Sequence, residues 1–196
     1  MKIHLIIPAR YKSTRFPGKP LTDIAGKTML RRVFDQCVQA FPAENICVAT
    51  EDERILEYCR SQQMHCVLTT DQCLTGTDRV AEAAELLDSD VCINVQGDEP
   101  LFNPEDIRLL VNRVQEQPQR IYAGYCEIES EEMYRSLSVP KMVMDTDERL
   151  LYTSRHPIPG NKTGGFRMAW RQVCAYAFHR EALRMYRGCA RKTPLE

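Results

Sequence analysis

The sequence predicts an α/β fold in which helices flank an open, mostly parallel sheet that carries an extension of mixed strands. Over the first 121 residues, short apolar segments alternate with segments that have the apolar spacing of helices. This alternation is typical of a parallel sheet with right-handed crossovers. Strand-like segments dominate after Ile121 and indicate the extension. Because no linker or internal repeat divides the chain, we expect a single domain over residues 1–196.

The elements before Ile121 follow one another closely. The run Ile3–Pro8 is almost continuously apolar, as expected of a parallel strand that is covered on both faces. Apolar residues at helical spacing predict a helix over 29–41. Asn103 and Pro104 are of the types preferred at a helix N-cap and first position, so another helix should begin there. The remaining segments are predicted as strand 46–50, helix 51–62, strand 66–68, helix 77–87 and strand 91–95.

The predicted extension consists of strand-like segments that a loop rich in proline and glycine interrupts. We interpret it as a mixed-sheet addition to the same domain. Its strands are expected at 123–128, 141–144, 150–154 and 173–178.

Composition and charge exclude several classes of protein. Hydrophobic residues make up 43% and charged residues 27% of the chain, which is typical of a globular domain. A net charge of −1 gives no overall field that would recruit nucleic acid. We expect no membrane insertion, because no segment approaches the roughly 20 apolar residues of a membrane span. We also expect no signal peptide, because the apolar run near the N-terminus, Ile3–Ile7, is too short. The nine scattered cysteines without a Cys-x-x-Cys pair favour free thiols and a cytoplasmic location.

A basic turn follows the first predicted strand, between Pro8 and Leu21. It carries four cations within ten residues, while small and turn-forming residues allow backbone N–H groups to approach a ligand. That combination suits a polyphosphate. A solvated basic loop is the alternative, but ligands of such sheets bind beyond the carboxyl ends of the strands, which favours function. The cations are Arg10, Lys12, Arg15 and Lys19, and the small or turn-forming residues are Ala9, Ser13, Pro17 and Gly18.

A polar tip ends the predicted strand 91–95. Gln96, Gly97 and Asp98 follow it directly, so Asp98 should lie at the carboxyl edge of the sheet and face the basic turn. One carboxylate together with phosphate oxygens and waters is a normal set of ligands for Mg²⁺. We therefore predict that Asp98 binds Mg²⁺ and that Gln96 is a neutral hydrogen-bonding partner of a substrate. The alternative is an ordinary Gly-Asp turn.

Three sequence blocks resemble the signatures of the CMP-sugar-acid synthetases, above all the 3-deoxy-manno-octulosonate cytidylyltransferases (CMP-Kdo synthetases). They have the family's order and spacing, and weaker similarity continues over essentially the whole chain. The blocks are the basic turn from Pro8 to Leu21, Thr75-Gly76-Thr77-Asp78-Arg79, and Asn94-Val95-Gln96-Gly97-Asp98-Glu99-Pro100. The resemblance implies a Rossmann-like fold of the nucleotide-diphospho-sugar transferase type.

The resemblance also implies a role for each candidate residue. Arg10, Lys19 and Asp98 would be catalytic, with Mg²⁺ as the cofactor on Asp98. Arg155 has an independent rationale, because an arginine fork is a natural partner of a sugar carboxylate. Ala9, Arg10, Ser13, Arg15, Lys19, Thr77 and Arg79 would bind the nucleotide, and Gln96, Arg155, Gln172 and Tyr176 would face the sugar acid.

The implied reaction is attack of the anomeric hydroxyl of a sugar acid on the α-phosphorus of CTP, which releases pyrophosphate. Such chemistry depends on alignment and charge neutralisation rather than on a side-chain nucleophile. The partners would be CTP and the sugar acid, in a homodimer formed through the strand-rich section after Ile121. A role in lipopolysaccharide or capsule precursor synthesis follows by analogy.

The chain departs from the family pattern in two places. Gln172 stands where the family usually has a histidine, so a modified octulosonate is a possible substrate. The chain ends at Glu196, whereas the family pattern continues to an aspartate that supplies a second metal carboxylate, so we expect a C-terminally truncated domain.

Two alternatives remain open: a CTP-binding module without turnover, and a nucleotide-sugar glycosyltransferase that uses Asp145 and Asp147.

Overall fold

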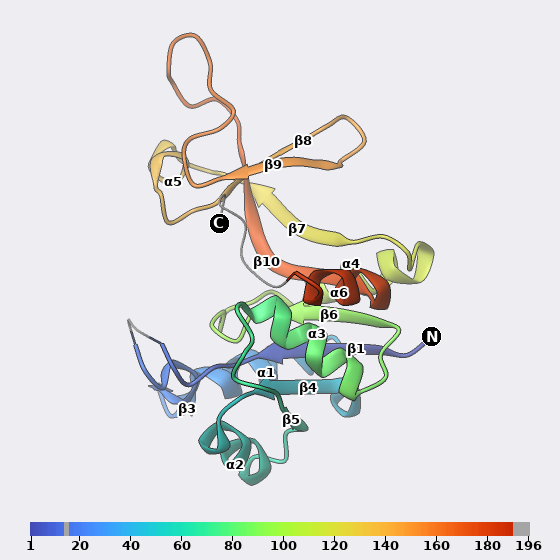
Figure 1. The fold of residues 1–196 in the computed structure, drawn as a ribbon. Helices are drawn as coiled ribbons and strands as arrows, with labels where there is room; N and C mark the ends of the chain where they lie inside the picture. The colour runs from blue at the N-terminus through green and yellow to red at the C-terminus, as the bar shows by residue number, and fades with distance from the viewer. Residues whose placement is uncertain (14–15, 190–196) are drawn as a thin grey trace. The chain divides into compact units, whose positions relative to one another are not determined.

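The computed structural model describes residues 1–13 and 16–189, which form two compact units. Unit 1 comprises Met1–Tyr122 together with the chain from Ala175 onward, and unit 2 comprises Ala123–Cys174 (Figure 1). The break falls close to Ile121, where the sequence pattern changes from alternating strands and helices to strands. The predicted extension therefore corresponds to unit 2 except for the end of its last predicted strand, 173–178, which lies in unit 1 from Ala175 onward.

Unit 1 is built on a sheet with the strand order β5-β4-β1-β6-β10. The strands β1 (Ile3–Pro8), β4 (Ile46–Thr50), β5 (Cys66–Leu68) and β6 (Val91–Val95) are parallel. The second half of β10 (Trp170–His179) pairs with β6 in the antiparallel direction. Every residue of β4 and β6 is buried, as their apolar sequences predict for strands covered on both faces. The predicted fold class is confirmed.

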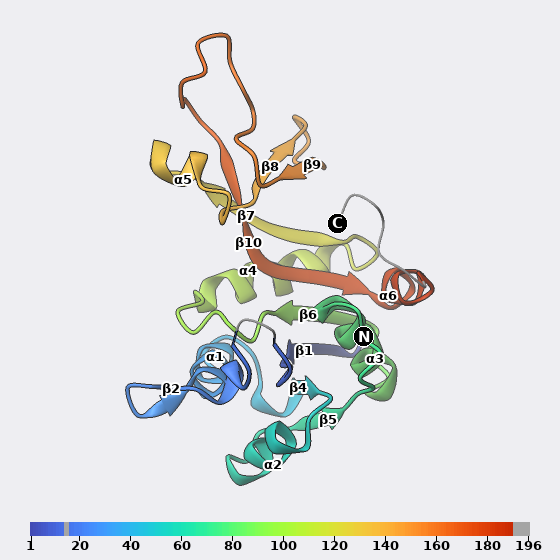
Figure 2. The ribbon, with the colours of Figure 1, turned by 60° about the vertical axis from the view of Figure 1, so that its left-hand side comes forward.

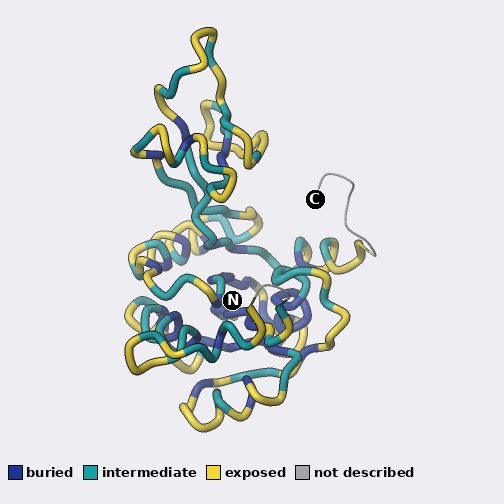
Figure 3. The backbone as a smooth tube through the Cα atoms, turned by 90° about the vertical axis from the view of Figure 1, so that its left-hand side faces the viewer, coloured by how far each residue is buried: buried dark blue, intermediate teal, exposed yellow. Residues whose placement is uncertain are grey.

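Helices cover both faces of this sheet. The helices α3 (Gly76–Leu86) and α6 (Arg180–Arg187) lie on one face, and α1 (Met29–Cys37) and α4 (Pro104–Glu116) lie on the other (Figure 2). The helix α2 (Glu53–Ser61) packs at the edge, beside β5 and β4. The buried residues of unit 1 gather where these helices meet the sheet (Figure 3). No helix in the described parts of the chain is long and apolar enough to cross a bilayer.

Local sequence signals explain where the helices begin. Asn103 accepts a hydrogen bond from the backbone N–H of Glu105 and caps α4, with Pro104 at the first position as predicted. Thr28 caps α1 by accepting from the N–H of Arg31. The helix α1 ends at Cys37, four residues earlier than the predicted end at Phe41, and turns fill the remainder.

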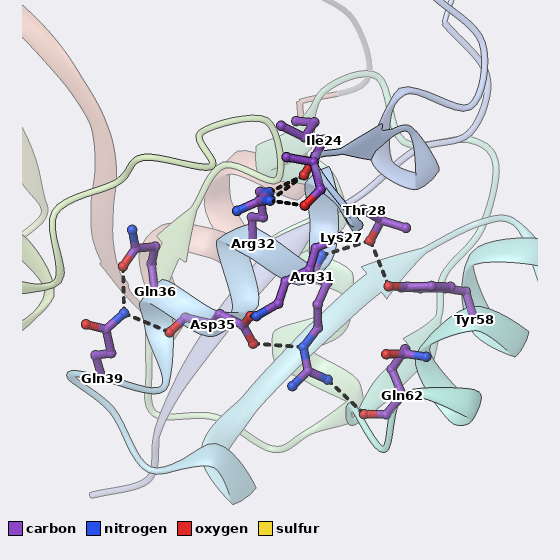
Figure 4. A network of polar contacts seen from close by, with 11 residues as sticks. Ile24, Lys27, Thr28, Arg31, Arg32, Asp35, Gln36, Gln39, Tyr58 and Gln62 are labelled. Atoms are coloured by element: carbon purple, nitrogen blue, oxygen red, sulfur yellow. Dashed lines mark hydrogen bonds and ion pairs between the residues drawn. The ribbon is translucent and has the colours of Figure 1, made fainter.

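A polar network ties α1 to its neighbours (Figure 4). Asp35 accepts hydrogen bonds from Lys27 at 2.6 Å and from Arg31 at 2.8 Å. The guanidinium of Arg32 donates to the carbonyl of Ile24 in the short hairpin formed by β2 (Asp23–Ile24) and β3 (Lys27–Thr28). This hairpin follows the basic turn, and two 3-10 segments, η1 (Lys19–Leu21) and η2 (Ala43–Asn45), complete the connections.

Unit 2 contains β7 (Tyr122–Glu127) from its second residue onward, β8 (Lys141–Met144) and β9 (Leu150–Ser154). The first half of β10 and the short helix α5 (Glu131–Arg135) complete it. The strands β8 and β9 form an antiparallel pair, and Trp170 of β10 pairs with Met142 of β8. A small core surrounds Ile128, Tyr134 and Ala169. The four strands predicted after Ile121 are therefore present.

Candidate functional site

A cavity of about 530 Å³ opens in unit 1 where β1 and β6 end. Its wall combines the basic turn, the first turn of α3 and the polar tip that follows β6. These are the segments that the three sequence blocks contain. The described residues that line it are Pro8, Ala9, Arg10, Ser13, Phe16, Lys19, Pro20, Met29, Leu74, Thr75, Gly76, Arg79, Gln96, Gly97 and Asp98.

The basic turn and the tip of β6 meet in this cavity. The ammonium of Lys19 lies 2.6 Å from a carboxylate oxygen of Asp98. The predicted convergence of these two segments is confirmed. The two side chains are 37% and 53% exposed, and ion pairs at such exposure contribute little to stability. Each partner can therefore exchange the other for an ion or a phosphate that enters the cavity.

Gly18 gives the basic turn its shape. Its φ of 73° lies in the left-handed region, which glycine adopts without steric strain. The N–H of Gly18 donates to the carbonyl of Tyr11 at 2.9 Å and closes the turn. Lys19 follows at the start of η1, while Arg10 precedes Tyr11 and is exposed to solvent. Arg15, the remaining predicted phosphate ligand of the turn, lies outside the described residues.

The first turn of α3 forms the opposite side of the cavity. The Thr75 hydroxyl and the Asp78 carboxylate form a capping box, and Thr75 and Gly76 line the cavity. A helix N-terminus offers unpaired N–H groups and a partial positive charge to an anion. Thr77, which the resemblance singled out, lies in the same turn but is not among the described lining residues. The Thr-x-x-Asp spacing was the signal that could have identified Thr75.

Arg79 lines the cavity and forms a buried ion pair. One nitrogen of its guanidinium lies 2.9 Å from an oxygen of Glu51, and both side chains are only 6% exposed. Arg79 also donates a hydrogen bond to the hydroxyl of Thr69. Its charge is thus largely balanced inside the protein. The role of Glu51 was not predicted, because nothing in its local pattern indicates a partner 28 residues further along the chain.

Gly97 allows the tip of β6 to lie against the end of β1. A Cβ atom added at this position would lie 2.7 Å from the carbonyl oxygen of Pro8, closer than real Cβ contacts. The close approach places Gln96 and Asp98 in the cavity wall on either side of Gly97. Gly76 of α3 is also near the amide of Gln96, since its added Cβ would lie 3.4 Å from the Gln96 Oε1.

The residues predicted to face the sugar acid belong to both units. Gln96 lines the cavity of unit 1. Tyr176 lies on β10 opposite Asn94 of β6, with its ring stacked on that of Phe178 at a centroid distance of 6.0 Å. Arg155 and Gln172 lie in unit 2, where the Arg155 guanidinium donates to the carbonyl of Leu137 at 3.1 Å.

The Asp145-Thr146-Asp147 pattern forms a turn. One carboxylate oxygen of Asp145 accepts the backbone N–H groups of Asp147 at 2.9 Å and Arg149 at 2.8 Å. This is the hydrogen bonding of a turn between β8 and β9, which weakens the glycosyltransferase alternative. Asp98 is the single carboxylate in the described lining of the cavity, and no three His, Cys, Asp or Glu side chains cluster as metal ligands in residues 1–13 and 16–189.

Comparisons with known proteins identify the family of this chain. A family model described as cytidylyltransferase matches residues 4–196. The 3-deoxy-manno-octulosonate cytidylyltransferase of Protochlamydia amoebophila is 44% identical over 167 residues, which are 83% of this chain and 64% of that protein. The enzyme of the same name from Escherichia coli is 34% identical, with 94% of this chain and 75% of that protein covered. The chain thus spans about two thirds to three quarters of these relatives.

Solved structures have the same fold. A CMP:2-keto-3-deoxy-manno-octonic acid synthetase complexed with CTP superposes with a TM-score of 0.90 at 32% identity, covering 99% of this chain and 80% of the other. A cytidylyltransferase from Leptospira borgpetersenii superposes with a TM-score of 0.65 at 18% identity, which supports the fold alone. Because the family model matches residues 4–196 and relatives of that name are 34–44% identical over most of the chain, the chain belongs to the cytidylyltransferase family.

Proposed function

We propose that this chain binds CTP and transfers its CMP group to the anomeric hydroxyl of a 3-deoxy-ulosonic acid, with release of pyrophosphate. The observation that carries the proposal is the convergence of Arg10, Lys19, Asp98 and the first turn of α3 on one cavity. Cationic side chains, unpaired helix N–H groups and a single carboxylate together suit a triphosphate and its counter-ion.

The reaction requires positioning rather than a protein nucleophile. The hydroxyl oxygen of the sugar forms a bond to the α-phosphorus, and the bond from that phosphorus to the oxygen bridging the α- and β-phosphates breaks. The hydroxyl proton passes to solvent, and pyrophosphate leaves with the bridging oxygen. Arg10 and Lys19 would hold the phosphates and offset their negative charge in the transition state. Ala9, Ser13 and the start of α3 would supply small or polar contacts along the triphosphate.

Asp98 is the proposed ligand of Mg²⁺. Its carboxylate offers hard oxygen atoms at the edge of the cavity, half exposed and paired with a lysine that can release it. Mg²⁺ in nucleotide sites commonly takes one or two carboxylates and completes its shell with phosphate oxygens and waters. When bound, the ion would offset the charge of the triphosphate and of the leaving pyrophosphate. The donor set of the described cavity fits that role.

The sugar acid is the less constrained substrate. The relatives are named for 3-deoxy-manno-octulosonate, and we propose this sugar acid or a modified form of it. Gln96 would contact it from the cavity, and Arg155, Gln172 and Tyr176 are the further candidates. By analogy the product would serve lipopolysaccharide or capsule precursor synthesis. The nine free cysteines support a cytoplasmic location, because free thiols persist in a reducing compartment.

The test is a pyrophosphate-release assay with CTP, Mg²⁺ and a panel of ulosonic acids, on this chain and on any longer natural form. We expect release only when CTP, Mg²⁺ and an ulosonic acid are all present. The Asp98→Asn variant should lose most of this activity, whereas Asp147→Asn in the turn of unit 2 should retain it. The proposal fails if the folded, longer form releases no pyrophosphate with any member of the panel. CTP binding without turnover by this chain alone would instead identify it as a binding module.

A further inference from the structure

Tyr11 closes the basic turn through both of its backbone groups. Its carbonyl accepts the N–H of Gly18 at 2.9 Å, and its own N–H donates to a carboxylate oxygen of Glu51 at 3.3 Å. Arg10 directly precedes Tyr11, and Lys19 directly follows Gly18. The closure therefore brings together the two backbone positions that directly adjoin the cavity cations Arg10 and Lys19.

The ring of Tyr11 reinforces the closure. The guanidinium carbon of Arg54 lies 3.3 Å from the ring centroid, which is a stacked cation–π contact. Arg54 is itself fixed, because it donates two hydrogen bonds to the carboxylate of Asp52 at 2.8 and 2.7 Å. The ring also lies close to Gly18, whose added Cβ would be 3.1 Å from the phenol carbon and oxygen. A side chain at position 18 would therefore press against the ring of Tyr11.

Glu51 extends the arrangement to the other side of the cavity. One of its carboxylate oxygens holds the N–H of Tyr11, and the other lies 2.9 Å from the guanidinium of Arg79, a residue of α3 that lines the cavity. The Glu51 and Arg79 side chains are almost fully buried, so this pair is little screened by solvent. Glu51 thus joins the basic turn to α3, two segments that form walls of the cavity.

We propose that Tyr11, Glu51 and Arg54 are positioning residues that hold the basic turn in its phosphate-binding form before nucleotide arrives. The described lining of the cavity includes none of the three, so they act through Arg10, Lys19 and Arg79 rather than by touching the substrate. This inference rests on the proposed function. A turn that is already ordered loses less conformational freedom on binding, so its affinity for a polyphosphate is higher.

The first experiment compares surface arginines of α2. Arg54→Ala removes the stacked guanidinium, and Arg54→Lys keeps the positive charge but loses the planar group. Arg60→Ala, at an exposed position of the same helix, is the matched control. Binding of CTP and of inorganic triphosphate is measured by calorimetry. We expect both dissociation constants to rise about threefold, equivalent to ~0.65 kcal/mol, in both Arg54 variants and to stay unchanged in Arg60→Ala.

Variants of Tyr11 and Glu51 separate positioning from folding. Tyr11→Phe keeps the ring and both backbone bonds and should bind CTP like the unmodified chain, whereas Tyr11→Ala should bind about tenfold more weakly. Glu51→Gln keeps an oxygen acceptor for the Tyr11 N–H but removes the charge that faces Arg79. In the turnover assay, the KM for CTP should rise in Tyr11→Ala and Glu51→Gln, while the KM for the sugar acid stays constant. A purely structural role would instead lower the active fraction and leave both KM values unchanged.

A readout without nucleotide distinguishes this inference from the proposed function. Residue-resolved hydrogen exchange reports the protection of the Gly18 N–H in the free protein. Faster exchange at Gly18 in Arg54→Ala, Arg54→Lys and Tyr11→Ala, but not in Arg60→Ala or Tyr11→Phe, supports the positioning role. Unchanged exchange in all variants, or unchanged triphosphate affinity in the Arg54 pair, overturns it. Failure of the unmodified chain to bind CTP would contradict the proposed function, and the exchange result would still decide the role of Tyr11.

Discussion

At the scale of single residues, the site depends on a close approach that only glycine permits. Gly97 lies where an added Cβ would be 2.7 Å from the Pro8 carbonyl oxygen, a backbone atom that cannot move away cheaply. We predict that Gly97→Ala lowers the free energy of unfolding by about 1–3 kcal/mol, as overpacked sites do. Chemical denaturation measures the loss. Gly160→Ala is the control, because its added Cβ meets no atom within 4 Å. Equal stability of the two variants would contradict the close contact.

The histidine of the central strand makes stability depend on pH. Burial, with neighbouring His65 and Lys2, lowers the pKa of His4 below its ordinary value of 6.5, and its Nδ1 lies 2.7 Å from the hydroxyl of Ser89. In the pH window between the lowered pKa of His4 in the folded chain and 6.5, the unfolded chain therefore binds more protons than the folded chain. We predict that the free energy of unfolding rises with pH through this window and is constant above it as far as His4 is concerned.

The control for His4 removes one of its neighbours. In His65→Gln the pKa of His4 should move upward, towards 6.5, because a like charge has been removed. NMR titration of the imidazole resonances measures the pKa of His4 in both proteins. Titration of His4 at or above 6.5 in the unmodified chain would contradict the sign of the predicted pH dependence.

At the scale of elements, the N-terminus of α3 connects fold stability to ligand binding. The Thr75 hydroxyl accepts a hydrogen bond from the backbone N–H of Asp78. It also forms a hydrogen bond with the hydroxyl of Tyr186 at 3.1 Å, and Thr75 lines the cavity. We predict that Thr75→Ala costs about 1 kcal/mol of stability, the usual value of a lost N-cap. It should also weaken CTP binding, because a frayed first turn presents its N–H groups to a phosphate less well.

Thr75→Ser is the conservative partner of that variant, since it keeps the hydroxyl and removes only a methyl group. Thermal unfolding and calorimetry should show near-native stability and CTP affinity for Thr75→Ser and a loss of both for Thr75→Ala. If Thr75→Ala binds CTP as tightly as the unmodified chain, the start of α3 does not contribute to the phosphate site.

At the scale of the whole molecule, elements with strong apolar patterns were predictable and short polar ones were not. The buried strands β1, β4 and β6 were expected at their observed positions because parallel strands covered on both faces require continuous apolar runs. The helix α6 was not predicted, since only Leu183 among its residues is buried and half of its residues are charged. The hairpin of β2 and β3 and the short helix α5 are likewise too brief to produce a periodic signal.

The site was predictable where topology alone brings residues together. Lys19 and Asp98 follow the ends of neighbouring parallel strands, so their convergence followed from the predicted sheet. The Glu51–Arg79 pair depends on how α3 packs beside the end of β4, and no local spacing encodes it. The unit boundary near Ile121 coincides with a change in the sequence pattern, but the boundary between Cys174 and Ala175 does not, because β10 is one continuous strand that belongs to both units.

The expected homodimer leads to a prediction for the assembly as a whole. The hairpin of β8 and β9 in unit 2 exposes Leu151 at 63% and Tyr152 at 61%, an apolar surface of the kind that protein contacts cover. We predict that the chain forms a dimer through this hairpin and that Leu151→Arg shifts it to monomers, because a charge would be buried without a partner. Light scattering over a range of concentrations measures the state of assembly.

Leu109→Arg is the matched control, since Leu109 of α4 in unit 1 is 62% exposed. Dissociation by both variants, or by neither, would argue against a contact through unit 2, whereas selective dissociation by Leu151→Arg with unchanged CTP affinity would separate assembly from the nucleotide site.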